Sequence, residues 1–110
     1  MRQAKILFKG EEAGILTQYD DGSFTYRYHD QWLGDSGKPA ISLTLPKTEQ
    51  EYRSEHLFPF FFNMLPEGTN KQVVCRHMKI DQDDYFGLLL TTARYDTIGA
   101  ITVKKIEQPI

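Results

Sequence analysis

The hydrophobic pattern of the first 28 residues has a period of two, which is typical of β-strands. Apolar side chains occur at Ala4, Ile6 and Phe8, in a run from Ala13 to Tyr19, and at Phe24, Tyr26 and Tyr28. Asp20, Asp21 and Gly22 separate the last two runs and form a typical hairpin turn, because aspartate and glycine tolerate positive φ. The pattern therefore predicts three antiparallel strands joined by short turns.

The next stretch predicts a loop and then a fourth strand. Residues 29–39 contain two glycines and a proline, which favour a loop. Residues 41–45 alternate isoleucine or leucine with serine or threonine, so we expect a strand there that ends at Pro46. Residues 47–53 are polar and predict a connection to the helical part of the chain.

The first helix is predicted around a cluster of phenylalanines. Apolar residues at 57, 60, 61, 64 and 65 have the spacing of one helix face. Pro59 fits only the first turn, so the helix begins shortly before it. Phe58 and Phe62 then lie off the sheet-facing side and are left for another helix or for a partner protein.

Two more helices and a last strand complete the prediction. Thr69 or Asn70 caps a helix to about Met78, with Val73, Val74, His77 and Met78 on or near its inner face. Asp81 caps a third helix, with an inner stripe of Tyr85, Leu88, Leu89 and Thr92. Residues 98–106 are apolar and β-branched, which predicts a strand. We expect an α+β fold: a mostly antiparallel sheet of about five strands, with about three helices inserted before the last strand.

Composition narrows the function classes. The 110 residues fit one globular domain, residues 1–110, and the net charge of −2 argues against a general binder of phosphate backbones. Cys75 is the only cysteine, so no intrachain disulfide forms, and the longest apolar run is too short to span a bilayer. We expect a cytoplasmic protein that does not bind membranes.

Candidate catalytic and metal motifs are weak. Residues 34–39, Gly-Asp-Ser-Gly-Lys-Pro, are similar to the nucleophile segment of trypsin-like proteases, but that chemistry needs a base, an acid and an oxyanion hole from a larger fold. A small hydrolase built on Ser36 and His29 is the weakest hypothesis. The same segment fails as a phosphate-binding loop, because Lys38 is followed by proline. The three histidines lack metal-ligand spacing, so we expect no metal and no cofactor.

The aromatic residues suit packing better than chemistry. Phe24, Tyr26 and Tyr28 lie on one strand face, but this strand lacks the basic neighbours of a base-stacking platform, so we expect them in the core. Trp32 lies beside the glycine-rich segment and is either a core residue or an anchor for a partner.

Four segments in order resemble the N-terminal subdomain of HipA-like kinases. They are Ile41–Pro46, Phe60–Gly68, Asp84–Leu89 and Asp96–Ile101. The family shows Ser-Leu-Ser-Leu-Pro, Phe-Phe-x-Asn-Leu-Leu-Pro-Glu-Gly, Asp-x-Phe-x-Leu-Leu and Asp-x-x-Gly-Ala patterns, and the Trp32-Leu33 stretch is also similar. The chain departs from the pattern at Arg94-Tyr95-Asp96, where the family often has Gly-Arg-Asp. It shows no kinase catalytic loop or metal-binding Asp motif.

The resemblance implies a binding module without catalysis. Stand-alone versions of this subdomain look like the small, HipS-like component of tripartite toxin–antitoxin systems. In such systems a separate HipA-like Ser/Thr kinase is the toxin, and a HipB-like helix-turn-helix protein completes the operon. The resemblance therefore implies that this chain is an antitoxin that binds a HipA-like kinase.

A subdomain separated from its kinase exposes the surface that once met the kinase core. The surplus aromatics and the turn between the first two helices are the best candidates for that surface, since helix starts offer free amide groups. We expect partner binding through Phe58, Phe62, Glu67, Gly68, Thr69, Asn70 and Trp32.

Two alternatives stay open. The chain could be a nucleic-acid-binding accessory of a HipB-like repressor, which requires a basic patch. The residues for such a patch are Arg2, Lys5, Lys9, Lys104 and Lys105. A homodimer that hides the aromatic surface is the other alternative.

Overall fold

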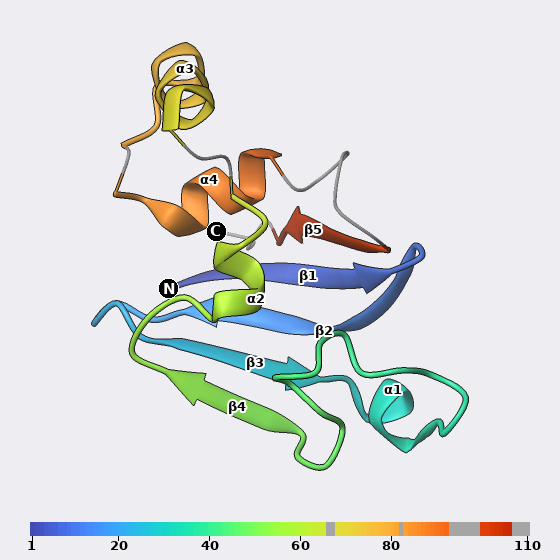
Figure 1. Cartoon of the computed structure of the whole chain (residues 1–110). Helices are drawn as coiled ribbons and strands as arrows, with labels where there is room; N and C mark the ends of the chain where they lie inside the picture. Colours follow the sequence, from blue (N-terminus) through green and yellow to red (C-terminus); the bar gives the residue numbers. More distant parts are fainter. Residues whose placement is uncertain (66–67, 82, 93–99, 107–110) are drawn as a thin grey trace.

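The computed structural model describes residues 1–65, 68–81, 83–92 and 100–106, and it shows one antiparallel sheet with helices packed on it (Figure 1). The elements are β1 (Arg2–Phe8), β2 (Glu11–Gln18), β3 (Phe24–Tyr28), α1 (Asp30–Gly34), β4 (Glu51–Ser54), α2 (Pro59–Phe62), α3 (Gly68–Met78), α4 (Tyr85–Thr92) and β5 (Ile101–Lys105). The strand order is β4-β3-β2-β1-β5. The predicted α+β class is confirmed, including three helices between the fourth and fifth strands.

The two predicted hairpins form as the turn residues indicate. In the β2–β3 turn the Tyr19 amide donates to the Ser23 carbonyl at 2.9 Å, and Gly22 adopts a φ of +88°. The Asp21 carboxylate accepts hydrogen bonds from the backbone and hydroxyl of Ser23 at 2.9 and 2.6 Å. Because Asp21 and Gly22 both suit this geometry, the turn sets the pairing of Gln18 with Phe24.

The fourth strand is not where the alternating pattern predicted it. Residues 41–45 form a turn, in which the Leu45 amide donates to the Ser42 carbonyl at 3.1 Å and Leu43 is fully exposed. The fourth strand is β4, which overlaps the segment predicted as a polar connection, and it pairs with β3 at the edge of the sheet. β4 is short and mostly polar, with Glu51 and Arg53 exposed and Tyr52 and Ser54 half-buried, which is common for an edge strand.

The helices also differ from the prediction at their ends. The helix expected over 57–65 is one turn, α2, because Pro59 begins it and residues 57–58 remain extended. α4 begins at Tyr85, later than predicted. Its cap is Asp84 and not Asp81, because the Asp84 carboxylate accepts a hydrogen bond from the Gly87 amide at 3.1 Å. Residues 29–39, expected to be a loop, contain the short helix α1. The predicted strand over 98–106 is observed as β5; residues 98 and 99 lie outside the described part.

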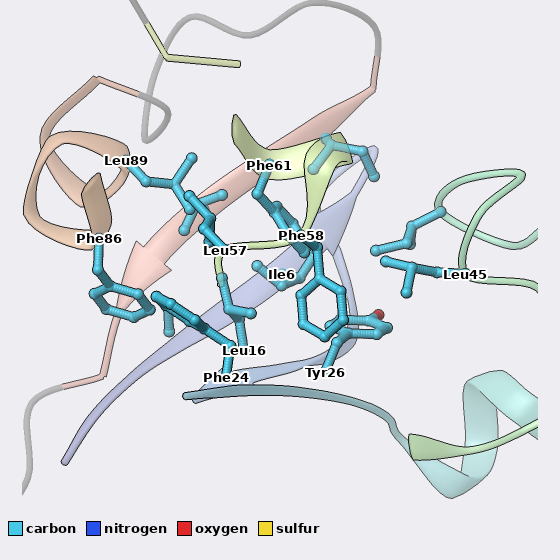
Figure 2. Close-up of a cluster of buried hydrophobic side chains, with 14 of the residues drawn as sticks. Ile6, Leu16, Phe24, Tyr26, Leu45, Leu57, Phe58, Phe61, Phe86 and Leu89 are labelled. Carbon is cyan, nitrogen blue, oxygen red and sulfur yellow. The ribbon is translucent and has the colours of Figure 1, made fainter. Parts of the chain in front are cut away.

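The core lies between the sheet and the helices α2 and α4 (Figure 2). Tyr26 and Leu16 come from adjacent strands, and Phe61 and Phe86 come from the two helices; all four side chains are fully buried. Phe24 and Phe86 stack with ring centroids 6.1 Å apart, and Tyr26 and Phe61 are 6.0 Å apart. The sheet aromatics predicted as core are therefore confirmed as core.

Candidate partner-binding surface

The phenylalanines of residues 58–62 divide between core and surface. Phe58 is 7 % exposed and belongs to the buried cluster drawn in Figure 2, whereas Phe62 is 46 % exposed. Phe58, which the sequence pattern leaves for another helix or for a partner protein, is therefore buried within the chain itself, and its role in partner binding stays a prediction. Pro59 is the physical cause of this burial. The helix starts after Phe58, and the extended backbone at Phe58 turns its ring inward against Phe61.

Phe62 forms an exposed aromatic pair with Tyr85 of α4. The two ring centroids are 5.4 Å apart in an edge-to-face arrangement, and Tyr85 is 36 % exposed. The Lys71 ammonium lies 5.0 Å from the centroid of the Tyr85 ring, which brings α3 to the same place. Exposed aromatics from separate helices are common anchors of protein interfaces.

A groove of about 390 Å³ opens beside this pair. We call it the aromatic groove; its lining residues are Gln18, Gly22, Phe24, Glu55, His56, Leu57, Phe62, Asp83 and Tyr85. Phe24 and Leu57 are buried and form its apolar base, whereas Glu55 and Asp83 are exposed carboxylates. The groove therefore combines aromatic walls with negative charge.

α3 projects away from the sheet beyond α4 (Figure 1). Val73 and Met78, expected on its inner side, are 60 % and 45 % exposed, while Cys75 is buried. The helix thus turns a different side inward and leaves Val73 and Met78 on the surface. The sequence pattern missed this because α3 has no strong amphipathic stripe.

The predicted turn ahead of α3 is only partly described. Glu67 lies outside the described residues, and Gly68, Thr69 and Asn70 form the first turn of α3. Their role in partner binding stays a prediction.

Trp32 is part of the core. It is 4 % exposed, its ring lies 5.8 Å from that of Phe8, and its indole nitrogen donates to the Pro39 carbonyl at 2.8 Å. The Lys38 ammonium lies 5.3 Å from the ring and also pairs with Glu11. The chain's own residues therefore cover the indole that we considered as a partner anchor.

The basic residues proposed for nucleic-acid binding are partly neutralised. Arg2 pairs with Asp84 at 2.7 Å, and Lys5 pairs with Glu12 at 3.1 Å. Lys104 and Lys105 are exposed on β5, opposite Lys5 and Ala4 of β1. Two of the five charges therefore have carboxylate partners, whereas Lys9, Lys104 and Lys105 form no ion pair with the described residues.

The protease-like segment does not assemble a nucleophile and base in the described part of the chain. Ser36 is exposed, and no hydrogen bond joins it to His29, whose Nε2 lies 3.4 Å from a Glu12 oxygen. The Asp35 carboxylate accepts the Gly37 amide at 2.9 Å, which is a turn contact. Within the same described residues, no cluster of three metal-ligating side chains forms.

The helices resolved here are all too short or too polar to cross a membrane.

Comparison with known proteins agrees with this geometry. The family model described as the HipA N-terminal domain matches residues 4–104. The chain belongs to this family. A solved structure described as the "N-terminal domain of HipA toxin" matches with a TM-score of 0.73 and 29 % identity, over 99 % of this chain and 96 % of that one.

Relatives of two lengths share this HipA N-terminal domain. An uncharacterized protein of Haemophilus influenzae is 30 % identical over 108 residues, which cover 98 % of this chain and 96 % of the relative. Two putative kinases of Sinorhizobium fredii, Y4mE and Y4dM, are 27 % and 29 % identical. The matched part covers only 21 % and 25 % of these kinases, respectively.

Proposed function

We propose that this chain is a non-catalytic binding module that docks on a HipA-like Ser/Thr kinase and regulates it, as an antitoxin does. The observation that carries the proposal is the occurrence of the same domain in two contexts. It forms about a fifth to a quarter of two putative kinases, and nearly all of a relative of this chain's own length. A domain that meets a kinase within one chain has a surface suited to meet it between chains.

The exposed apolar side chains supply that surface. Phe62 and Tyr85 form an open aromatic pair, and Val73 and Met78 are exposed on the projecting helix α3. Large apolar side chains that remain in water on a small domain favour burial in an interface. We therefore place kinase docking on the α2–α3–α4 side of the sheet.

α3 adds a charge asymmetry that favours a specific encounter. Residues 68–80 contain Lys71, Arg76 and Lys79 and no acidic residue, whereas the rest of the chain has ten basic and fifteen acidic residues. A basic region on an otherwise acidic protein orients a charged partner during diffusional approach. A kinase surface that receives α3 is expected to be acidic.

The first test is recovery of the partner. The chain is tagged at either end in turn and expressed in its native cells, and the co-purifying proteins are identified by mass spectrometry. Recovery of a HipA-like kinase supports the proposal, and purified kinase is then assayed for autophosphorylation with and without the chain. Recovery of the chain alone with both tags, or an unchanged kinase rate at saturating chain, contradicts it.

Matched variants then test the placement. Phe62→Asp and Val73→Asp each put a carboxylate on the α2–α3–α4 side, and Leu43→Asp puts the same group on the exposed turn at residues 41–45. We expect the first two to weaken kinase binding at least about tenfold, the size of a modest interface hot spot. Leu43→Asp is expected to change it less than about twofold. The reverse order would move the docking surface to that turn.

A further inference from the structure

The aromatic groove has unbalanced charge. Glu55 and Asp83 are exposed at it, and neither carboxylate forms an ion pair with a described residue. Among the described lining residues, His56 is the only one whose side chain can carry a positive charge. The walls are the rings of Phe62 and Tyr85, and aromatic faces attract cations. The Lys71 ammonium already lies 5.0 Å from the centroid of the Tyr85 ring, whereas no cation of a described residue lies over the Phe62 ring. Aromatic faces next to unpaired carboxylates form a receptor for an organic cation.

The same fold already holds a guanidinium in such surroundings next to the groove. The Arg2 guanidinium lies 5.0 Å from the centroid of the Phe86 ring and donates to the Asp84 carboxylate at 2.7 and 3.0 Å. It also donates to the Gln18 carboxamide oxygen at 2.9 Å, and Gln18 lines the groove as well. Ring and carboxylate recur in the groove as Phe62, Glu55 and Asp83, and no cation of the described residues is paired with these three side chains.

We infer that the aromatic groove receives an arginine side chain of the protein that this chain binds. Arginine fits this groove better than lysine, because its planar, weakly hydrated guanidinium can stack on a ring and pair with a carboxylate at the same time. An apolar side chain would instead remove water from Glu55 and Asp83 without compensation, and an anion would be repelled. The identity of the partner as a kinase rests on the proposed function, whereas the preference for arginine rests on the groove itself.

A titration tests the groove chemistry without any partner protein. The ¹⁵N-labelled chain is titrated with N-acetyl-arginine amide, and amide shifts are followed by NMR. We expect saturable shifts at Leu57, Phe62 and Tyr85. N-acetyl-citrulline amide, which has the same shape without charge, should bind at least about fivefold more weakly. Equal binding of citrulline, or shifts confined to other residues, would overturn the inference.

Variants that leave the packing intact provide the second test. Glu55→Gln combined with Asp83→Asn removes both groove charges, and Glu49→Gln combined with Glu51→Gln removes two exposed charges outside it. The groove pair should weaken N-acetyl-arginine amide at least about fivefold, and the control pair less than twofold. Equal weakening by both pairs would mean that only net charge matters, and it would refute an arginine site.

Kinase binding separates this inference from the proposed function. If the kinase binds the unchanged chain and the groove pair equally well, the partner places no arginine in the groove, and the inference fails while the proposed function stands. If the unchanged chain binds no kinase, the proposed function fails, and the citrulline comparison still decides whether the groove is an arginine site.

Discussion

Asp84 has two separable roles at the start of α4. Its carboxylate caps the helix by accepting the Gly87 amide at 3.1 Å, and it pairs with the Arg2 guanidinium at 2.7 Å. A Cβ on Gly87 would overlap this carboxylate, so the glycine leaves the room that the cap needs. One side chain thereby ties β1 to α4.

Substitutions at Asp84 separate the two roles. Asp84→Asn keeps a capping oxygen and loses the charge, so we expect a loss of stability of up to about 1 kcal/mol, because the pair is partly exposed. Asp84→Ala loses the cap as well and should cost about 1 kcal/mol more. Urea unfolding at pH 7 measures both values. Equal losses in the two variants would show that the cap contributes nothing.

The charge at Asp84 also predicts a pH dependence. The hydrogen bond from Arg2 and then that from Gly87 hold the pKa of the Asp84 carboxyl below its usual range. A lowered folded-state pKa stabilises the fold above the unfolded-state pKa of about 3.9, and this contribution disappears as pH falls through the lower folded value. The stability gap between the unchanged chain and Asp84→Asn should therefore close below about pH 3.9. A gap that is constant from pH 7 to pH 2.5 would contradict this.

Tyr26 carries a buried hydroxyl without a hydrogen-bond partner among the described residues. Burial raises the pKa of this hydroxyl, and the ring fits because Gly14 on the neighbouring strand has no Cβ, which would lie 2.6 Å from the oxygen. Removing an unpaired buried group costs little, so Tyr26→Phe should leave the free energy of unfolding unchanged or raise it by up to about 1 kcal/mol. A loss above about 1 kcal/mol in thermal unfolding would indicate an unseen partner, such as a buried water.

At the scale of elements, the segment at residues 41–46 shows why alternation alone misleads. In a strand Ile41, Leu43 and Leu45 would share one face, but Ile41 and Leu45 are buried and Leu43 is exposed, which is a spacing of four and not of two. The spacing arises instead from a turn, in which the Ser42 hydroxyl accepts the Thr44 amide at 3.2 Å. Serine and threonine side chains compete with ladder hydrogen bonds in this way, and the Tyr28 hydroxyl bonds to the backbone at both ends of the turn.

Tyr28 holds this turn against the sheet. Its hydroxyl accepts the Ile41 amide at 3.1 Å and donates to the Leu45 carbonyl. Tyr28→Phe leaves both buried groups unpaired, so we expect a loss of about 1–3 kcal/mol, in contrast to Tyr26→Phe. Hydrogen exchange at the Ile41 amide should accelerate most. Equal stability of the two tyrosine variants would contradict the assigned bonds.

α2 shows a limit of helix periodicity. The positions 57, 60, 61, 64 and 65 have one-face spacing, yet the helix spans only Pro59–Phe62 and both Leu57 and Phe58 are buried. The Met64 and Leu65 amides donate to the carbonyls of Phe61 and Phe62, which continues the chain as tight turns. A proline fixes where a helix starts, but where it ends depends on packing that a single sequence does not display.

At the scale of the whole molecule, the sequence predicts local pairings better than distant ones. The hairpins β1–β2 and β2–β3 follow from turn residues a few positions apart, and both form. β4 and β5 lie on opposite edges of the sheet. Their pairing joins residues 24–28 to 51–54 and residues 4–8 to 101–105, and no local sequence signal predicts these long-range pairs. The aromatic groove depends on the same long-range assembly, because its residues come from four separate segments. Its chemistry was therefore invisible until the fold was known.

β5 closes the sheet, and we predict that its loss unfolds the whole domain. Val103 is fully buried opposite Ile6 of β1, so Val103→Asp buries an unpaired carboxylate, which should cost at least about 3 kcal/mol of the roughly 5–15 kcal/mol available to a domain. Lys104→Asp places the same group on the exposed side and should cost less than about 1 kcal/mol.

Trp32, the only tryptophan, reports from α1, a different part of the fold. The unfolding transitions followed by Trp32 fluorescence and by far-ultraviolet circular dichroism should have the same urea midpoint, because the core is continuous from β5 to Trp32. A native Trp32 signal after the dichroism has changed would mean that the two ends of the sheet unfold separately.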